Sequence, residues 1–400
     1  MKSIRIHYFA FMSRREFSML TGRQKIEAAF TRDGSREFAA AACWEDVFVR
    51  DHWDQLTATP WYDQYSPDLE RQMAWRSKAL ARTGQDLLIV PSFYSRQERE
   101  QLTIVDQPEG VFLIDQASSK RKKLEPPIVG GWSQFGQMES ASFARLPTTP
   151  DEFEVAVALP APVDIERIVA DGRADLACAL LQAHGTELYP ITEVYAPLWY
   201  LYELWGFEGM MTLIGERPDL VERACPHLTA RTLAAVREAA ILGAAGVWIW
   251  ESFTDMISPQ AYEAFSVPGM RRVVEECRHL GIKSIYNFSG NPAGKLDAIL
   301  SVGADALALE ESKKDFVVDI NELAAYADGR CTLFGNLDVI GILQNGSDPQ
   351  LRDAITEQIA AGRRNQNRFV VCLGSPVTPS TPVDRVRLYC DLAREMSHDR

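Results

Sequence analysis

The sequence predicts an α/β protein folded as a (β/α)8 barrel, and its C-terminal part gives the main evidence. Five apolar runs, each followed by a helix-like segment, end at intervals of roughly 23 to 36 residues, as parallel strands joined by crossover helices require. The runs are GVWIWE, KSIYN, ALALEE, CTLFGN and RFVVC. The length of 400 residues suits one barrel with an insertion. In a closed barrel all strand ends meet on one face, where barrel enzymes place their chemistry.

The elements of the N-terminal part follow in order. Residues 21–31 predict a short helix that begins after Thr21, and a strand is expected around 38–49. Residues 66–84 predict a helix with Ser66 as its cap, Pro67 in the first turn and a glycine past its end. LLIVPSF is the next expected strand. Residues 1–20 are interpreted as an N-terminal arm and 21–400 as one barrel domain.

The βα pattern is interrupted at about 98–150, which predicts an insertion on the barrel. TIVDQPEGVFLID has the pattern of an antiparallel hairpin, and SSKRKK that of a basic loop. This loop is either a solvated hairpin tip or a site for an anionic ligand or a partner. The pattern then resumes with strands expected in PTTPDEFEVAVALP and LYPITEVYAPLW. A long helix follows, which Pro226 should kink or split, and residues 258–281 predict one or two helices.

Composition limits the class of partner. The chain is 46% apolar and 24% charged, as ordinary soluble proteins are. A net charge of −13 argues against nucleic acid or an anionic membrane surface and favours a small molecule. No apolar run reaches the roughly 18 residues of a membrane-spanning helix. The seven cysteines are scattered singly, which predicts a reduced, cytoplasmic protein.

Several segments together resemble a known family. They are TGRQKIEAAFTRDG, YAPLWYLYELWGFEGMM, ERPDLVERA, WESFTDMISPQAYEAFSVPGMRRV, YNFSGNPAGKLDAILSVGADALAL, GNLDVIGILQNG and SPVTPSTPVDRV. From Glu193 to Asp384 the chain resembles the uroporphyrinogen decarboxylase (URO-D) superfamily, which also holds methylcobamide methyltransferases. The resemblance implies a barrel of the URO-D type, and a homodimer.

The chain departs from both chemistries of that family. In its zinc-dependent methyltransferases a HxCG motif and a distant cysteine hold the metal, and the matching positions are Asn287 and Ser289, with Ser375 or Cys372. Asn and Ser are poor zinc ligands, so no metal is expected there. The decarboxylases use an early aspartate, where this chain reads IVPSFYS, and a late histidine, which falls on Ser375. Tetrapyrrole decarboxylation thereby loses support.

Candidate site residues are the polar and aromatic groups at strand ends. Glu251 and Asp255 form a candidate acid–base pair, or else Asp255 caps a turn and Glu251 binds backbone. Either Glu310 or Glu311 faces the mouth, because side chains alternate along a strand. The candidate substrate-binding residues are Tyr195, Trp199, Tyr286, Asn287, Ser289, Asn291, Glu310, Asn336, Asp338, Cys372 and Ser375. For these the competing interpretations are a turn held by asparagines, a helix cap at Asn336 and Asp338, and core packing of Cys372.

The leading hypothesis is methyl-group transfer without the usual zinc, linked to a corrinoid or a folate. No tightly bound cofactor is expected; methylcobalamin or tetrahydrofolate would be a co-substrate, and a corrinoid protein a partner. Tyr195 and Trp199 would offer a flat wall to a planar ligand. One alternative is a decarboxylase of a carboxylated tetrapyrrole or aromatic, with Arg50, Arg76 and the basic loop as its cations. The other is a non-catalytic corrinoid- or tetrapyrrole-binding protein.

Overall fold

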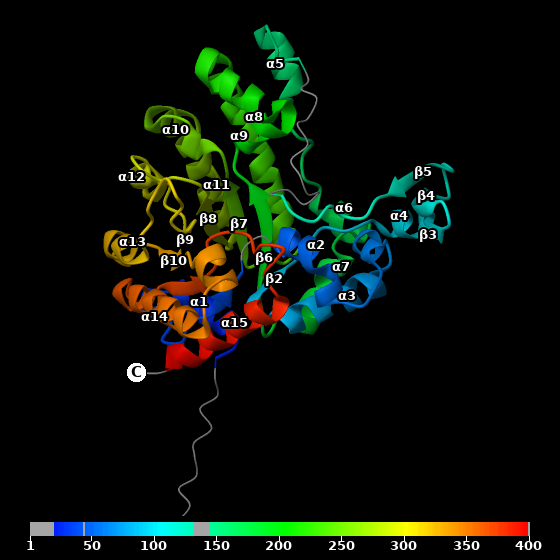
Figure 1. Ribbon diagram of the computed structural model, residues 1–400. Helices are drawn as coiled ribbons and strands as arrows, with labels where there is room; N and C mark the ends of the chain where they lie inside the picture. Colours follow the sequence, from blue (N-terminus) through cyan, green and yellow to red (C-terminus); the bar gives the residue numbers. More distant parts are fainter. Residues whose placement is uncertain (1–19, 43–44, 132–144, 399–400) are drawn as a thin grey trace, which may run out of the picture.

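Eight parallel strands form a nearly closed barrel with helices around it (Figure 1). The computed structural model describes residues 20–42, 45–131 and 145–398. Around the barrel the strands are β1 (Ala40–Ala41), β2 (Leu87–Ile89), β6 (Tyr189–Tyr195), β7 (Gly246–Glu251), β8 (Lys283–Phe288), β9 (Ala306–Leu309), β10 (Thr332–Phe334) and β11 (Phe369–Cys372). The predicted barrel is confirmed, and the five apolar runs of the C-terminal part are β7 to β11.

One backbone hydrogen bond and two hydrogen bonds from backbone N–H groups to side chains close the seam between β1 and β2. Asp86 donates its backbone N–H to the Ala40 oxygen at 2.8 Å, and its carboxylate accepts from the Ala40 N–H at 2.7 Å. Gln85 Oε1 accepts from the Ala42 N–H at 3.2 Å. The barrel wall is therefore held here by an aspartate and a glutamine instead of a strand ladder.

The strand side chains separate into an inner and an outer apolar layer. The inner layer fills the lumen with large groups, among them Tyr189, Trp248, Trp250 and Phe334. Helix α1 (Gly22–Ala29), capped by Thr21 as predicted, contributes Ile26 and Ala29 to the same layer. The helix thus closes one end of the lumen, and the carboxyl ends of the strands remain as the open face.

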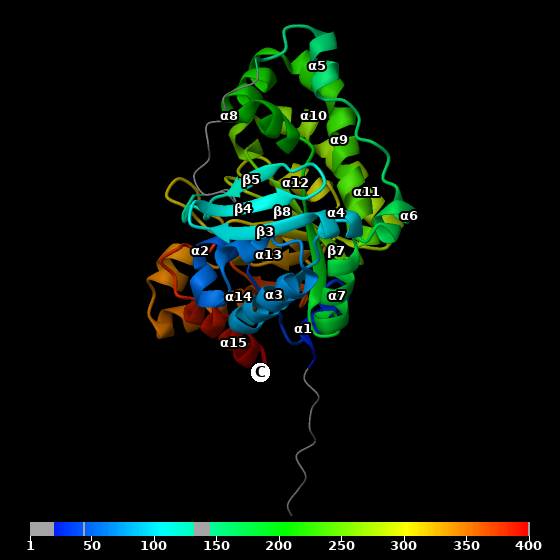
Figure 2. The ribbon, with the colours of Figure 1, turned by 90° about the vertical axis from the view of Figure 1, so that its right-hand side faces the viewer.

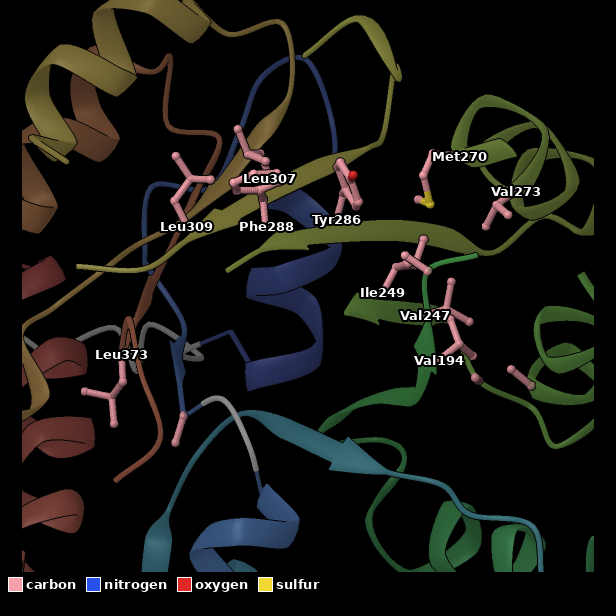
Figure 3. Packing of buried hydrophobic residues seen from close by; sticks show 14 of the residues in the cluster. Val194, Val247, Ile249, Met270, Val273, Tyr286, Phe288, Leu307, Leu309 and Leu373 are labelled. Carbon is pink, nitrogen blue, oxygen red and sulfur yellow. The ribbon is translucent and has the colours of Figure 1, made fainter. Parts of the chain in front are cut away.

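The outer layer packs against the surrounding helices. Figure 3 shows Val247 and Ile249 of β7 on the side that faces Met270 and Val273 of a neighbouring helix. The helices are α2 (Glu45–Leu56), α3 (Leu69–Thr83), α4 (Arg96–Gln101), α5 (Pro150–Ala156), α6 (Ile165–Ala170), α7 (Asp175–His184), α8 (Trp199–Glu216), α9 (Pro218–Ile241), α10 (Pro259–Phe265), α11 (Val267–Leu280), α12 (Leu296–Ser301), α13 (Ile320–Ala327), α14 (Asp348–Arg364) and α15 (Val383–His398). None of the helices in the described ranges is long and apolar enough to cross a membrane.

An antiparallel sheet projects beside the barrel. It consists of β3 (Leu102–Gln107), β4 (Gly110–Asp115) and β5 (Arg121–Leu124). Figure 1 shows this sheet at the side of the barrel, and Figure 2, which views the molecule from that side, shows it in front of the barrel. The predicted hairpin is confirmed as β3 and β4. The prediction that the basic segment SSKRKK is entirely a loop is wrong, because its second half belongs to β5 and pairs with β4. Residues 132–144 of the expected insertion, and most of the expected arm, lie outside the described residues. The division into arm and barrel domain stays a prediction.

Four expected elements differ in the structure. The helix expected over 66–84 begins at Leu69, because the side chain of Asp68, and not that of Ser66, caps it by accepting from the backbone N–H groups of residues 70 and 71. The strand expected over 38–49 is only Ala40–Ala41, and α2 begins at Glu45. The strand expected in PTTPDEFEVAVALP is helix α5, because Thr149 accepts from the Glu152 N–H and Pro150 occupies the first turn. Pro226 lies inside the single helix α9 and does not split it. Residues 258–281 do form two helices, α10 and α11.

Candidate functional site

Strand β6 directs a carboxyl group into the barrel mouth. Tyr189 and Ile191 belong to the inner layer, so strand alternation places Glu193 and Tyr195 on the lumen side as well. Glu193 lines a cavity together with Glu45 and Asp46 from the start of α2. The sequence reasoning did not select these three residues. A lone carboxylate within an apolar strand was the signal that could have found Glu193.

This cavity has a volume of about 340 Å³, at the small end of ligand sites. It is lined by Glu45, Asp46, Val49, Arg50, Gln64, Tyr65, Trp75, Arg76, Ile89, Pro91 and Glu193. Arg50 pairs with Asp51 at 2.6 Å. The Arg76 guanidinium lies over the Trp75 ring, 4.3 Å from its centroid. Carboxyl and guanidinium groups therefore share one small volume at the ends of β2 and β6.

Burial keeps protons on the carboxyl groups of this cavity. It raises the pKa of Glu45 to about 7, although the nearby Arg76 charge and a 2.6 Å hydrogen bond from Gln85 lower it. It raises the pKa of Glu193 well above its usual range, and the charges of Asp46 and Glu45 act in the same direction. Burial also lowers the pKa of Arg76 to about 10. Carboxyl groups that share a site keep their protons to higher pH, because two negative charges would repel each other. Glu45 and Glu193 can therefore act as acids near neutral pH.

A stack of aromatic rings borders the carboxyl groups. Tyr195 and Trp199 lie parallel with ring centroids 4.4 Å apart, and Trp199 stacks on Phe253 at 5.8 Å. Burial raises the pKa of Tyr195, and the neighbouring charges of Asp46 and Glu193 raise it further. The stack is therefore next to the acidic cavity. Tyr195 is 39% exposed, which leaves part of this aromatic surface open to a ligand.

A second pair of carboxyl groups, Asp255 and Glu310, lies just after the ends of β7 and β9. Ala306 and Ala308 face the lumen and Leu307 and Leu309 face outward, so Glu310 continues the inner register and Glu311 the outer one. This resolves the choice that the sequence left open. Burial raises the pKa of Glu310 to about 7; the Lys313 charge lowers it, while the charges of Glu311 and Asp255 raise it.

The loop after β8 contacts this second carboxyl pair. The Asn291 N–H donates to Asp255 Oδ2 at 3.4 Å, and Lys295 Nζ donates to the Asp255 backbone oxygen at 2.9 Å. Burial raises the pKa of Asp255 as well. The structure therefore brings together Asp255, Glu310 and Asn291, three of the residues predicted from the sequence.

The positions of the family's zinc ligands hold groups that do not fit zinc. Ser289 Oγ donates to Asn287 Oδ1 at 3.2 Å, so an amide and a hydroxyl occupy the motif. Cys372 lies in the inner layer, where burial raises the pKa of its thiol and opposes the thiolate that a metal requires. Within the described ranges no group of three or more His, Cys, Asp or Glu side chains is placed to hold a metal ion. Neutral oxygen donors are not the sulfur and nitrogen ligands that zinc prefers.

Glu251 does not join Asp255 in the mouth. It continues the outer register of Val247 and Ile249, and its side chain is fully buried. Its Oε2 accepts from Ser266 Oγ at 2.6 Å and from the Tyr286 hydroxyl at 2.7 Å. Tyr286 also faces outward (Figure 3). The expected acid–base pair is therefore not formed, because Glu251 is buried against Ser266 and Tyr286, whereas Asp255 contacts the loop after β8.

Asn336 and Asp338 stabilise the wall of the barrel. Asn336 Nδ2 donates to the backbone oxygens of Glu310 and Val318 at 3.3 and 3.1 Å. Asp338 accepts from the backbone N–H groups of residues 340 and 341, as the capping alternative expected. Both residues line a cavity of about 510 Å³ that lies between the barrel and helices α13 and α14. This larger cavity is outside the lumen, so the smaller cavity at the strand ends is the candidate active site.

Ser375 belongs to a closed hydrogen-bond triangle. Its Oγ donates to Glu311 Oε2 at 2.7 Å, and Lys313 Nζ lies 2.6 Å from both Ser375 Oγ and Glu311 Oε1. Glu311 is 3% exposed, so the triangle is mostly buried. At this position the structure therefore holds a neutral hydroxyl tied to an ion pair, and no histidine.

A (β/α)8 barrel with ionisable groups at the carboxyl ends of its strands has the architecture of the barrel enzymes. The model of the family "Uroporphyrinogen decarboxylase (URO-D)" matches residues 126–396, more than half of the chain. The protein belongs to this family.

The relatives agree with this membership, and one solved structure shares the fold. The uroporphyrinogen decarboxylase of Paraburkholderia xenovorans is 29% identical over 227 residues, which cover 53% of this chain and 59% of that protein. The one from Cupriavidus necator is 28% identical over 285 residues, or 66% and 74% of the two chains. The chain spans about half to three-fifths of the length of the first curated relatives it matches. A methyltransferase from Methanosarcina mazei shares the fold, with a TM-score of 0.62, 15% identity and coverage of 94% and 99%.

Proposed function

We propose that this protein transfers a methyl group from a small neutral or cationic donor, without zinc, to a corrinoid or reduced folate acceptor. One observation carries the proposal. The cavity at the strand ends places Glu45, Asp46 and Glu193 beside a stack of aromatic rings, and burial keeps protons on Glu45 and Glu193 near neutral pH.

The carboxyl groups suit the proton that demethylation requires. As the methyl carbon bonds to the acceptor, its bond to the donor oxygen or nitrogen breaks and leaves a lone pair on that atom. The protonated carboxyl group of Glu45 or Glu193 gives its proton to that lone pair, which stabilises the departing group. Tyr195 and Trp199 bind the apolar part of the donor and exclude water from the methyl group.

The same cavity is a poor match for a substrate with many carboxylates. Three carboxyl groups line it against two guanidinium groups, and Arg50 already pairs with Asp51. Decarboxylation is the second candidate, because the curated relatives named above are decarboxylases and Arg76 supplies one cation in the cavity. A binding protein without catalysis is the third.

The test is turnover with a panel of methyl ethers and N-methyl compounds, with cob(I)alamin or tetrahydrofolate as acceptor. Formation of methylcobalamin is followed by absorbance, and carbon dioxide release from uroporphyrinogen is measured in parallel. Glu193→Gln should lower kcat/KM for the active donor by about 100-fold, the scale of general acid catalysis. Glu276→Gln, on the outer side of α11 where it pairs with Arg237, should leave it unchanged. Carbon dioxide release without methyl transfer would overturn the proposal, and binding without either reaction would indicate a binding protein.

A further inference from the structure

The cavity at the strand ends contains an arginine, Arg76, whose two terminal guanidinium nitrogens make no hydrogen bond within the described part of the chain. Arg76 donates from Nε to Gln72 Oε1 at 3.4 Å and lies on the Trp75 ring. In the described part of the chain its two terminal nitrogens make no hydrogen bond, and no carboxylate lies within 4.0 Å of them. A guanidinium on an aromatic face presents paired N–H groups in the geometry that a carboxylate accepts. Arg76 is therefore held ready for an anionic group.

The carboxyl groups that line the same cavity are suited to a cation. Glu193 receives no hydrogen bond from the described residues, whereas Glu45 accepts from Gln85 and Asp46 from the Val47 N–H. Both oxygens of the Glu193 carboxyl group are therefore available to a ligand. It lies one inward position before Tyr195, whose ring begins the aromatic stack. A cation bound beside Glu193 favours the ionised form of this carboxyl group and lowers its pKa, and the neighbouring aromatic ring attracts the same cation through its quadrupole.

We propose that this cavity binds a small zwitterion, with its carboxylate on Arg76 and its alkylated ammonium group between Glu193, Asp46 and Tyr195. The inference rests on the proposed function and names its substrate class, an N-methylated amino acid. A zwitterion matches both kinds of charged group in the cavity and adds no net charge to it. A volume of about 340 Å³ accommodates such a molecule, whereas a polyanion would place further negative charge beside the three carboxyl groups.

Isothermal titration of the full chain at neutral pH, with no methyl acceptor present, tests the inference. Three probes share one shape: glycine betaine has both charges, choline keeps the cation without the carboxylate, and 3,3-dimethylbutyrate keeps the carboxylate without the cation. Betaine should bind at least about tenfold more tightly than either of the others, the ratio expected from one charge-assisted hydrogen-bonded contact.

Two variants assign the contacts. Arg76→Gln should weaken betaine binding by about 10- to 100-fold and leave choline binding unchanged. Glu193→Gln should weaken betaine and choline but not 3,3-dimethylbutyrate. Arg237→Gln, which removes a surface arginine on α9, is the matched control and should change none of the three. Circular dichroism confirms that each variant is folded.

The inference is overturned if betaine gives no heat at millimolar concentration, if 3,3-dimethylbutyrate binds as tightly as betaine, or if Arg76→Gln has no effect. Failure of the proposed function looks different. Betaine binding with the predicted variant pattern, but without methyl transfer, would support the zwitterion site and refute the transferase. Methyl transfer from an ether by a protein that does not bind betaine would refute only the zwitterion site.

Discussion

Replacing Glu310 by glutamine should remove a pH-dependent part of the stability. Burial raises the pKa of this carboxyl from 4.5 to about 7. The folded protein therefore holds a proton on Glu310 that the unfolded chain releases at lower pH. The stability that comes from this proton is complete below about pH 4.5 and is lost as the pH rises through about 7. At about 1.4 kcal/mol per pH unit the shift corresponds to about 3 kcal/mol, and partial solvent access reduces this to about 1 to 3 kcal/mol.

The assay is urea unfolding of the native protein and of Glu310→Gln at several pH values between about 5 and 8. Glutamine keeps the shape of the side chain and cannot ionise. The stability of Glu310→Gln relative to the native protein should therefore rise with pH, by about 1 to 3 kcal/mol across this range. Other carboxyl groups with a raised pKa that do not interact with Glu310, such as Glu45, titrate in both proteins and largely cancel in the difference.

A stability difference that stays flat across the pH range would refute the reasoning. It would mean that Glu310 ionises at the same pH in the folded and unfolded chains, and that the buried lumen position does not hold its proton. Glu276→Gln serves as the control, because Glu276 forms a surface ion pair with Arg237 at 2.7 Å. Its stability difference should vary by less than about 0.5 kcal/mol with pH.

Three further substitutions test the packing and the backbone. Tyr286→Phe removes a hydroxyl that donates to the buried Glu251 carboxylate, and should lower the free energy of unfolding by about 1 to 3 kcal/mol in urea. Gly206→Ala should cost about 1 to 3 kcal/mol, because Gly206 has φ 67° and ψ −177° within α8; Gly215→Ala, where an added Cβ meets nothing within 4 Å, should be neutral or stabilising. Met270→Ala should lower the stability by about 2 to 5 kcal/mol, since the side chain is fully buried, and a loss below about 1 kcal/mol would contradict the packing described for α11.

The positions of the C-terminal strands could be predicted, but the direction of their side chains could not. GVWIWE is buried along its whole length, so its sequence does not show which alternate residues face the lumen. Glu251 was selected because it ends an apolar strand, and it faces outward. Glu193 lies within the strand YPITEVY, not at its end, and faces inward. The difference depends on the register between neighbouring strands, which one sequence does not encode locally.

Where local and tertiary preferences compete, the sequence was a weaker guide. EFEVAVA alternates as a strand would, yet the capping residue Thr149 and Pro150 favour the helix that forms. Glu45 and Asp46 reach the cavity because β1 is very short and α2 follows at once, and no periodicity indicated this. By contrast, Asp255, Asn291 and Glu310, each selected from the sequence, lie close together, since the ends of parallel strands converge whatever their register.

The seam between β1 and β2 gives the barrel a line of weakness that is coupled to the cavity. Gln85 accepts from the Ala42 N–H with one atom of its amide and donates to Glu45 with the other. Rotation of this one side chain breaks the hydrogen bond to Ala42 in the barrel wall and, at the same time, the hydrogen bond to the Glu45 carboxyl group in the cavity. A ligand that holds Glu45 thereby also slows local breathing of the seam, and the Ala42 amide becomes a hydrogen-exchange reporter of an occupied site.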